Sequence, residues 1–345
     1  MSRNHEVTEK QMLLNAEGEI AEPGWSRRPL QRYSRKMIKA PSWRIKEWDY
    51  YLVVNERFAG AFTISDDGYI GLQSVSLLRF GDEPWEHTET VLNAFPMGKL
   101  RLPRTSVKGV TKYEDKRLQM SFAVEGRTRH IQCRFENFCD GKPLSCDIIL
   151  SQPPMDSMVI ATPWDAKHAF YYNQKINCMR AEGYIEFDGE RFVFDPAKDF
   201  GTLDWGRGVW TYDNTWYWGS ASGLAGGVPF GFNIGYGFGD TSAASENMLF
   251  YNGKAHKLSR VKFEIPVRGG QDDFMSPWKF SSDDGRFEMD FVPVMDRCAK
   301  IDLKLICSDQ HQVFGRFSGT AVLDDGQKVE IKDLTGFAEK VRNKW

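Results

Sequence analysis

Tight-turn signals recur along this chain at short intervals and limit it to a fold built from hairpins. Asp-Asp-Gly occurs at 66–68, 283–285 and 324–326, and each copy separates two runs with the composition of strands. Asp188-Gly189 and Asn252-Gly253 divide two further pairs of such runs. These residues supply the positive φ angles that tight hairpin turns require. We therefore expect antiparallel pairing along much of the chain.

The runs between the turns alternate in polarity. In RFVFD (191–195) and RFEMDFVPV (286–294) apolar residues recur at every second position, the period of a half-buried strand. In the run 230–238, Phe, Ile and Tyr alternate with Gly and Asn. One face of that strand is bulky, and the other is nearly bare backbone that another element or a ligand can approach closely.

Helical signals are few: residues 6–16, residues 244–248 and an ambiguous run at 336–345. The fold class is therefore mainly β, with antiparallel barrels or sandwiches and few short helices. About 25 strand-like runs exceed what one sheet usually holds. We expect two β-domains, 1–175 with a basic N-terminal arm and 176–345, with the boundary lying between 155 and 200.

The charge balance argues against a nucleic-acid partner. The formal net charge is −2, so the chain has no global basic field. Residues 27–46 nevertheless carry eight Lys and Arg and no acid, and we name this segment the basic arm. We expect the basic arm to be solvated and docked on an acidic face. A site for an anionic ligand or a membrane surface is the alternative.

The sequence favours a cytoplasmic protein without stable membrane insertion. The first ten residues, MSRNHEVTEK, are polar, and no run of about 18 apolar residues follows. The six cysteines form no C-x-x-C pair and no metal-finger spacing. We expect them to be free and mostly buried thiols. The sequence does not indicate an oligomeric state.

The stretch DWGRGVWTYDNTWYWG, from 204 to 219, is the strongest site candidate. It places Trp205, Trp210, Trp216 and Trp218 beside Asp204 and Arg207, and such aromatic density suggests a ligand wall or a core layer. Asp204 can exchange a proton if burial raises its pKa, and Arg207 can hold a carboxylate or enolate. A direct pair between them requires a bend at the neighbouring glycines, because residues three apart on a strand face opposite sides. A structural polar network is the alternative.

Polar residues in neighbouring motifs extend the candidate site. Glu246 is a second candidate acid, and a pair of carboxylates formed with Asp240 would suit glycoside cleavage. Asp240 also fits a turn or helix cap. Tyr171, Asn173 and Lys175 share one face of a strand, where they can orient a polar ligand head or form an interdomain hydrogen-bond layer. The remaining ligand-binding candidates are Asn233, Tyr236, Asn247 and His256.

Cofactor signatures are missing from the sequence. It contains no phosphate loop, no G-x-G-x-x-G fingerprint, no H-E-x-x-H and no G-x-S-x-G elbow. The six histidines are scattered without ligand spacing. We therefore expect no metal site, and any chemistry to be independent of cofactors.

Long motifs of this chain resemble the bacterial domain-of-unknown-function 2804 family, over nearly its whole length. They are GWSRRPL, RIKEWDYY (44–51), PWDAKHAFYYNQKINCM (163–179), LDWGRGVW (203–210) and NIGYGFGDTSAASENMLFYNGKAHKL (233–258).

The layout also resembles, more distantly, the lipocalin-related group of hydroxyneurosporene synthase, tocopherol cyclase and AttH-like proteins. This resemblance implies two lipocalin-like β-barrels and a central Trp-Gly motif, here Trp205-Gly206 or Trp218-Gly219. It also extends to a final hairpin followed by Gly336, Phe337 and Glu339. Where relatives tend to have His before Trp-Gly, this chain has Asp204, so the resemblance assigns no reaction.

These observations favour a protein that binds a small, largely apolar molecule, such as an isoprenoid, lipid or polycycle, in an aromatic pocket. Acid–base hydration, cyclisation or isomerisation is the reaction class that such a pocket suits, with Asp204 or Glu246 as the acid and Arg207 stabilising negative charge. Two alternatives stay open: a non-catalytic lipid or sugar binding module or scaffold, and a carbohydrate-active enzyme with paired carboxylates.

Overall fold

The computed structural model describes residues 4–302 and 307–344. It confirms the mainly β class: apart from two 3-10 turns, η1 (Arg35–Met37) and η2 (Ser42–Arg44), the regular structure of this part is all strand. The helix expected over 6–16 is wrong, because this segment contains only the short strand β1 (Gln11–Met12). The helical turn expected at 244–248 is also wrong, since this segment is irregular up to the start of the next strand.

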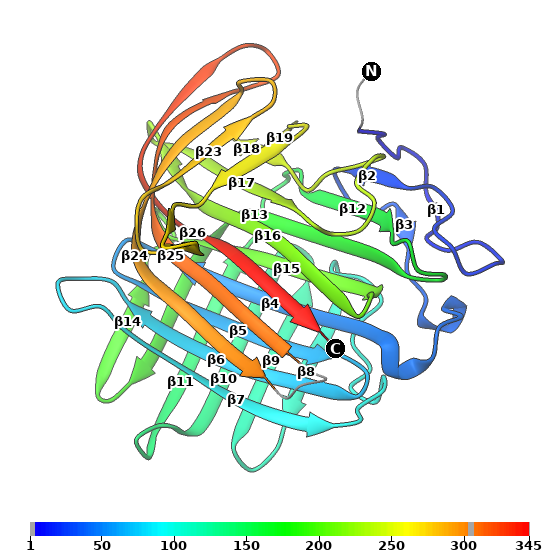
Figure 1. Ribbon diagram of the computed structural model, residues 1–345. Helices are drawn as coiled ribbons and strands as arrows, with labels where there is room; N and C mark the ends of the chain where they lie inside the picture. Colours follow the sequence, from blue (N-terminus) through cyan, green and yellow to red (C-terminus); the bar gives the residue numbers. More distant parts are fainter. Residues whose placement is uncertain (1–3, 303–306, 345) are drawn as a thin grey trace.

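The first sheet contains thirteen strands and curls into an antiparallel half-barrel (Figure 1). Its main path runs β7-β6-β5-β4-β15-β13-β11-β10-β9-β8; β12 and β14 pair with β13, and β2 pairs with β12. The strands are β2 (Gly24–Ser26), β4 (Ile45–Val54), β5 (Phe58–Asp66), β6 (Ile70–Arg79), β7 (Trp85–Ala94), β8 (Gly109–Glu114), β9 (Leu118–Glu125), β10 (Thr128–Cys139), β11 (Lys142–Ser151), β12 (Met158–Pro163), β13 (Phe170–Phe187), β14 (Glu190–Phe194) and β15 (Phe200–Val209).

The second sheet contains nine strands in the order β19-β18-β17-β16-β26-β25-β24-β23-β20 and forms another curled antiparallel half-barrel. Two short pairs, β1 with β3 and β21 with β22, lie outside the large sheets. These strands are β3 (Gln31–Arg32), β16 (Asp213–Ala225), β17 (Val228–Tyr236), β18 (Met248–Tyr251), β19 (Lys254–Lys257), β20 (Val261–Glu264), β21 (Val267–Arg268), β22 (Gln271–Asp272), β23 (Trp278–Ser282), β24 (Phe287–Asp302), β25 (Cys307–Val322) and β26 (Lys328–Lys344).

The turn signals fall where the sequence predicts hairpins. The three Asp-Asp-Gly turns join β5 to β6, β23 to β24 and β25 to β26, and each ends in a glycine with positive φ. Asp188 and Asn252 adopt φ values of 52° and 47°, followed by glycines at 78°. Residues that tolerate the left-handed region thus set the hairpin connections.

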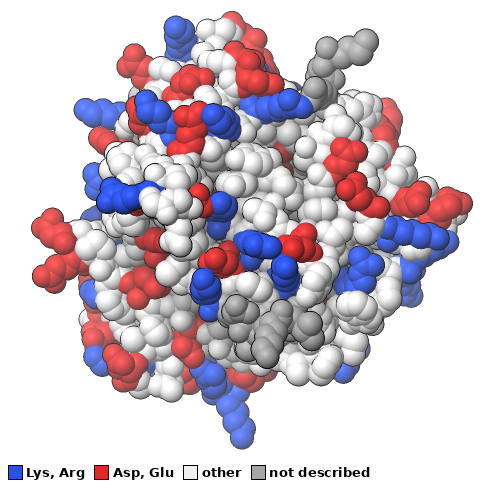
Figure 2. All heavy atoms as spheres, in the orientation of Figure 1, with Lys and Arg blue, Asp and Glu red and all other residues white. Residues whose placement is uncertain are grey.

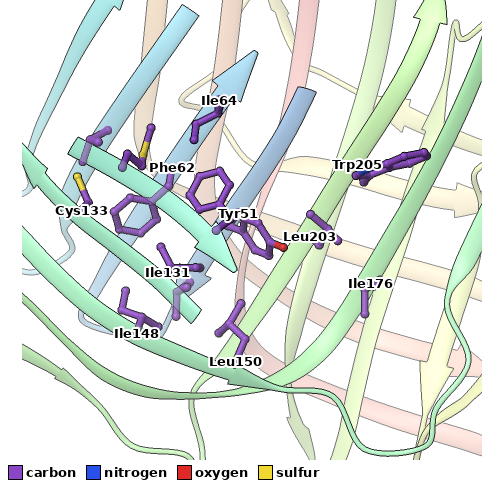
Figure 3. Close-up of a cluster of buried hydrophobic side chains, with 14 of the residues drawn as sticks. Tyr51, Phe62, Ile64, Ile131, Cys133, Ile148, Leu150, Ile176, Leu203 and Trp205 are labelled. Carbon is purple, nitrogen blue, oxygen red and sulfur yellow. The ribbon is translucent and has the colours of Figure 1, made fainter. Parts of the chain in front are cut away.

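Each half-barrel encloses its own apolar core. Figure 3 shows the first core, in which Leu203 and Trp205 of β15 join the cluster around Tyr51 and Phe62. The second core contains Phe230, Phe232 and Ile234, the bulky face predicted for the run 230–238. The outer faces of the two sheets meet in a third apolar cluster, which includes Tyr171, Trp210 and Trp218.

The bare face of β17 lies against strand β13 of the first sheet, where the two sheets come close together. A Cβ at Gly231 would lie 2.7 Å from Sγ of Cys178 on β13, so only glycine fits there without a shift. Nearby, Asn177 donates to Oγ of Ser220 at 2.8 Å and to the carbonyl oxygen of Phe232 at 3.1 Å. From the sequence, either another element or a ligand could approach this face. In the structure it is strand β13 that does so.

The chain passes from the first sheet to the second between Val209 and Asp213. This crossing lies beyond the domain boundary expected between 155 and 200. A change of sheet does not by itself define an independently folding unit, so the division into 1–175 and 176–345 stays a prediction.

Two arginines of the basic arm contact acids, whereas Lys46 at the end of the arm is buried in β4 and not solvated as expected. Arg27 lies 3.3 Å from Glu6 and 3.2 Å from Asp156, while Arg35 pairs with Glu47. Figure 2 shows basic and acidic side chains intermixed over one face of the molecule.

Candidate functional site

A cavity of about 270 Å³ lies where the two half-barrels meet. Strands β4, β5, β6, β13 and β15 wall it on one side, and β16, β24, β25 and β26 wall it on the other. Its aromatic walls are Trp48, Tyr50, Tyr171, Trp210, Trp216, Trp218 and Phe238. Its charged lining residues are Lys46, Asp67, Lys175, Asp204, Arg297 and Glu339. We name it the intersheet cavity.

Strand alternation brings these side chains together. Lys46, Trp48 and Tyr50 occupy every second position of β4, and Tyr171, Asn173 and Lys175 do so on β13. Across the ladder, Asp204 of β15 lies opposite Lys175 on one side and Tyr50 on the other. Residues that the sequence placed on common faces therefore meet between the sheets.

Lys175 and Asp204 form a buried ion pair at the cavity wall. Lys175 Nζ lies 2.8 Å from Oδ2 of Asp204 and 3.8 Å from the centre of the Trp218 ring. Asn173 donates to Oδ1 of Asp204 at 2.6 Å. Both carboxylate oxygens of Asp204 thus have donors, and its charge is balanced by a cation that is 1% exposed.

Glu246 lies behind Tyr171 and is not a lining residue of the intersheet cavity. It is 1% exposed, and its Oε1 accepts a 2.6 Å hydrogen bond from the Tyr171 hydroxyl. Asn233 donates to Oε2 at 3.3 Å and accepts from Trp218 Nε1 at 2.6 Å. Burial raises the pKa of Glu246, while Lys175 opposes that shift. Its Oε2 also lies 4.0 Å from Nζ of Lys175, so Glu246 contacts the cavity lining and not the cavity itself.

Glu339 of β26 lines the cavity directly, and the sequence analysis did not select it as a site residue. Trp216 Nε1 donates to its Oε1 and Gln312 Nε2 to its Oε2, each at 2.9 Å. No Lys, Arg or His of the described chain lies within ion-pair distance of this carboxyl. Burial raises the pKa of Glu339 to about 7, although the hydrogen bonds from Trp216 and Gln312 and the more distant charges of Lys175 and Arg297 oppose that shift.

The position of Glu339 could have been anticipated from one signal. It belongs to the Gly336-Phe337-x-Glu339 segment of the final strand, where a lone acid follows Gly, Phe and Ala. It lies directly opposite Trp218 on β16 and Gln312 on β25. Sequence alone does not show that β26 lies in the centre of its sheet, between those two strands.

The expected direct pair of Asp204 and Arg207 is wrong. Arg207 faces the interior of the first half-barrel, where it donates to Asp49 at 2.9 Å and to the carbonyl oxygens of Trp48 and Pro103. Strand β15 stays in continuous register with both neighbours here, so residues three apart keep opposite faces. Gly206 does not bend the strand; it makes room for Trp48, whose Cζ2 would lie 2.0 Å from a Cβ at that position.

The four tryptophans of this stretch also lie in two different places. Trp210, Trp216 and Trp218 line the intersheet cavity, whereas Trp205 belongs to the core of the first half-barrel. Its ring lies under the Arg207 guanidinium, with Cζ 4.2 Å from the ring centre.

Several predicted ligand residues lie elsewhere. Tyr236, Asp240 and Asn247 line a different cavity, of about 430 Å³, near Asn4 and Ser259. Asn247 accepts from the Gly235 backbone N–H and donates to the Ser259 carbonyl, both at 2.8 Å. His256 lies beside Asp324, with Nδ1 3.3 Å from the carboxylate. The structure does not bring these four residues to the intersheet cavity.

The described residues contain no group of three or more His, Cys, Asp and Glu side chains placed to hold a metal ion. All six cysteines are free, and Cys133, Cys146 and Cys178 are buried. None of the helices in the described ranges has the length and apolar character that crossing a membrane requires.

Comparison with solved structures finds a similar fold. A putative AttH from Nitrosomonas europaea is similar with a TM-score of 0.53 and 13% identity, over 90% of this chain and 97% of that one. CghA, in a crystal structure with Sch210972, is similar with a TM-score of 0.46 and 11% identity, over 96% and 97%. Kievitone hydratase from Nectria haematococca has the same TM-score and identity, over 97% and 98%.

No curated protein matches the sequence significantly. A family model does match, over residues 4–345. The chain belongs to the family described as domain of unknown function DUF2804.

Proposed function

We propose that the protein binds a small, largely apolar molecule in the intersheet cavity and transfers a proton to it from Glu339. The ligand class is isoprenoid-, lipid- or polycycle-like, and the reaction is hydration, cyclisation or isomerisation without a cofactor. The observation that carries this proposal is a buried carboxyl group without a cationic partner, in the wall of an aromatic cavity. Catalytic acids are tuned toward neutral pH by this kind of burial.

The aromatic walls support an apolar ligand. Seven aromatic residues line the cavity, and the ring of Trp218 already holds the ammonium group of Lys175 at 3.8 Å. The faces of such rings attract positive charge, including charge that develops on carbon. A wall of this kind can both bind a hydrocarbon and stabilise a cationic transition state.

Proton transfer from Glu339 gives a balanced reaction. The neutral carboxyl gives its proton to one carbon of an alkene, whose π electrons form the new C–H bond and leave a cation on the neighbouring carbon. In hydration, water adds to that carbon and returns a proton to the Glu339 carboxylate. In cyclisation, a second alkene attacks instead, and the cation that this leaves loses a neighbouring proton to the same carboxylate. In isomerisation, a C–H next to the first cation loses its proton to that carboxylate. Asp204 in the same wall is paired with Lys175 and takes no part in this proton transfer.

In the non-catalytic alternative, the ligand binds in the same cavity but undergoes no reaction. The carbohydrate-active alternative required Asp240 and Glu246 to face one substrate. Asp240 is exposed beside the cavity near Asn4, whereas Glu246 is enclosed between Tyr171 and Asn233. We therefore give this alternative no role in the proposal.

Deuterium transfer tests the proposal without advance knowledge of the substrate. The purified protein is incubated in D₂O with a panel of isoprenoid alkenes and polycyclic enones, and products are analysed by mass spectrometry. We expect enzyme-dependent C–D incorporation with at least one probe, falling about 100-fold or more in Glu339→Gln. Binding of the same probe should change little, because the amide keeps the volume of the carboxyl group.

Asp204→Asn is the comparison variant, because the sequence analysis named Asp204 as a candidate acid. We expect it to retain more activity than Glu339→Gln, because Asp204 is paired with Lys175 and gives no proton to the ligand. Incorporation that is unchanged in Glu339→Gln overturns the assignment of the acid. A ligand that is recovered unchanged from its host, with no incorporation from any probe, favours the binding module.

A further inference from the structure

A second cavity, of about 380 Å³, lies on the opposite face of strands β13 and β15. Tyr172, Gln174 and Trp205 form its inner wall, and they alternate along these strands with Tyr171, Lys175 and Asp204 of the intersheet cavity. Its outer wall comes from the basic arm and from residues 104–106. We name it the arm cavity.

The arm cavity has a cationic lining. Arg32 and Arg104 contribute to it, and none of its described lining residues is acidic. Neither arginine makes an ion pair with an acid of the described chain, in contrast to Arg27 and Arg35 of the same segment. Two guanidinium groups at one cavity provide paired donors for a carboxylate.

The acid that contacts the lining residue Tyr33 is already paired with a cation. Glu47 accepts from the hydroxyl of Tyr33, a lining residue, at 2.8 Å and pairs with Arg35. Arg207 Nε lies 3.9 Å from the same carboxylate. The two cavity arginines therefore face no opposing negative charge from this wall.

The inner wall holds a buried donor without an acceptor. Trp205 is 3% exposed, and its indole N–H has no hydrogen-bond partner among the described residues. The other polar side chains of that wall do have partners: Gln174 accepts from Ser106 and donates to Ser157, and the Tyr172 hydroxyl donates to the Gln31 carbonyl. A buried N–H normally has a partner, so its absence points to a ligand or water acceptor.

We propose that the arm cavity is a second ligand site, which binds a small organic carboxylate independently of the intersheet cavity. The carboxylate meets Arg32 and Arg104, and the carbon skeleton lies against Tyr33, Tyr172 and Trp205. The indole N–H of Trp205 takes an oxygen atom of the ligand as its acceptor. This site gives the basic arm a function beyond docking: it presents Arg32 toward a ligand.

Calorimetric titration with 2-naphthoate and with its neutral amide, 2-naphthamide, tests the charge recognition. We expect the wild-type protein to bind the carboxylate about tenfold more tightly, since charge-assisted hydrogen bonds are the stronger kind. The double variant Arg32→Gln/Arg104→Gln should lose this preference and still bind the amide. The matched control Arg28→Gln/Lys39→Gln removes two arm cations that do not line the cavity, and it should keep the preference.

A crystal structure with bound 2-naphthoate locates the site. Density with the carboxylate between Arg32 and Arg104 is the expected result. Density in the intersheet cavity, equal affinity for acid and amide, a preference that persists in the double variant, or no binding at millimolar concentration would overturn the proposal. None of these outcomes depends on turnover, so the acid role of Glu339 stands or fails separately.

Discussion

Arg207 and Glu339 are both buried, Arg207 in the interior of the first half-barrel and Glu339 in the wall of the intersheet cavity, and they differ in how they are paired. Toward the interior of the first half-barrel, Arg207 donates two hydrogen bonds from each terminal nitrogen, and its acceptors include Asp49. Toward the second sheet, the carboxyl of Glu339 faces a cavity without an ion-pair partner in the described chain.

This difference distinguishes a charged group that holds the fold together from one that is available for chemistry. An ion that is paired and hydrogen-bonded has little reason to exchange a proton, and it fixes the geometry around it. An enclosed carboxyl without a cation has its pKa moved toward neutrality and can act as acid and base. Arg207 belongs to the first kind and Glu339 to the second.

Arg207→Met should give the largest loss of stability. It leaves Asp49 buried without its cation, and breaking a buried pair in this way costs about 3–5 kcal/mol. Urea unfolding followed by far-UV circular dichroism measures the change. The control Arg191→Met removes an exposed arginine that pairs with Glu186, and should cost about 0.5 kcal/mol or less. Equal losses in the two variants would contradict the structural role of Arg207.

Glu339→Gln should make stability less dependent on pH. The folded pKa of Glu339 is about 7 and its ordinary value is 4.5, so the carboxyl contributes its full stability below pH 4.5 and loses it as pH rises through 7. The variant should therefore gain about 3 kcal/mol over wild type between pH 4 and pH 8.

The free energies of unfolding of the variant and of wild type are compared at both pH values, so any effect of the amide that does not depend on pH cancels. The variant Glu288→Gln serves as control, because it removes an exposed carboxyl from β24. A stability difference between Glu339→Gln and wild type that is the same at pH 4 and pH 8 would show that burial does not perturb this group.

Gly206→Ala should have a smaller effect on stability, and it should also disturb the intersheet cavity. The added methyl group meets the Trp48 ring, which must move into the intersheet cavity, and overpacking of this kind costs about 1–3 kcal/mol. Gly81→Ala, where a Cβ meets nothing within 4 Å, provides the control. Unfolding measurements and tryptophan fluorescence report both effects, and identical behaviour of the two variants would show that Trp48 does not need that space.

The sequence anticipated local structure better than the site. Hairpin turns and alternating faces follow from neighbouring residues, so the β class and the common face of Tyr171, Asn173 and Lys175 could be predicted. The pairing of Lys175 with Asp204 joins β13 and β15, which are separated in the chain by β14, and no local signal specifies that register. The role of Glu339 depends on contacts with β16 and β25, which only the folded sheet brings together.

The most direct test of the central claim is the titration of the Glu339 side chain itself. The protein is labelled with ¹³C at the glutamate carboxyl carbon, and the resonance of Glu339 is assigned by its absence in Glu339→Gln. We expect its chemical shift to change with a midpoint near pH 7. A midpoint near the ordinary value of 4.5 would contradict the claim that the intersheet cavity holds a carboxyl poised for proton transfer.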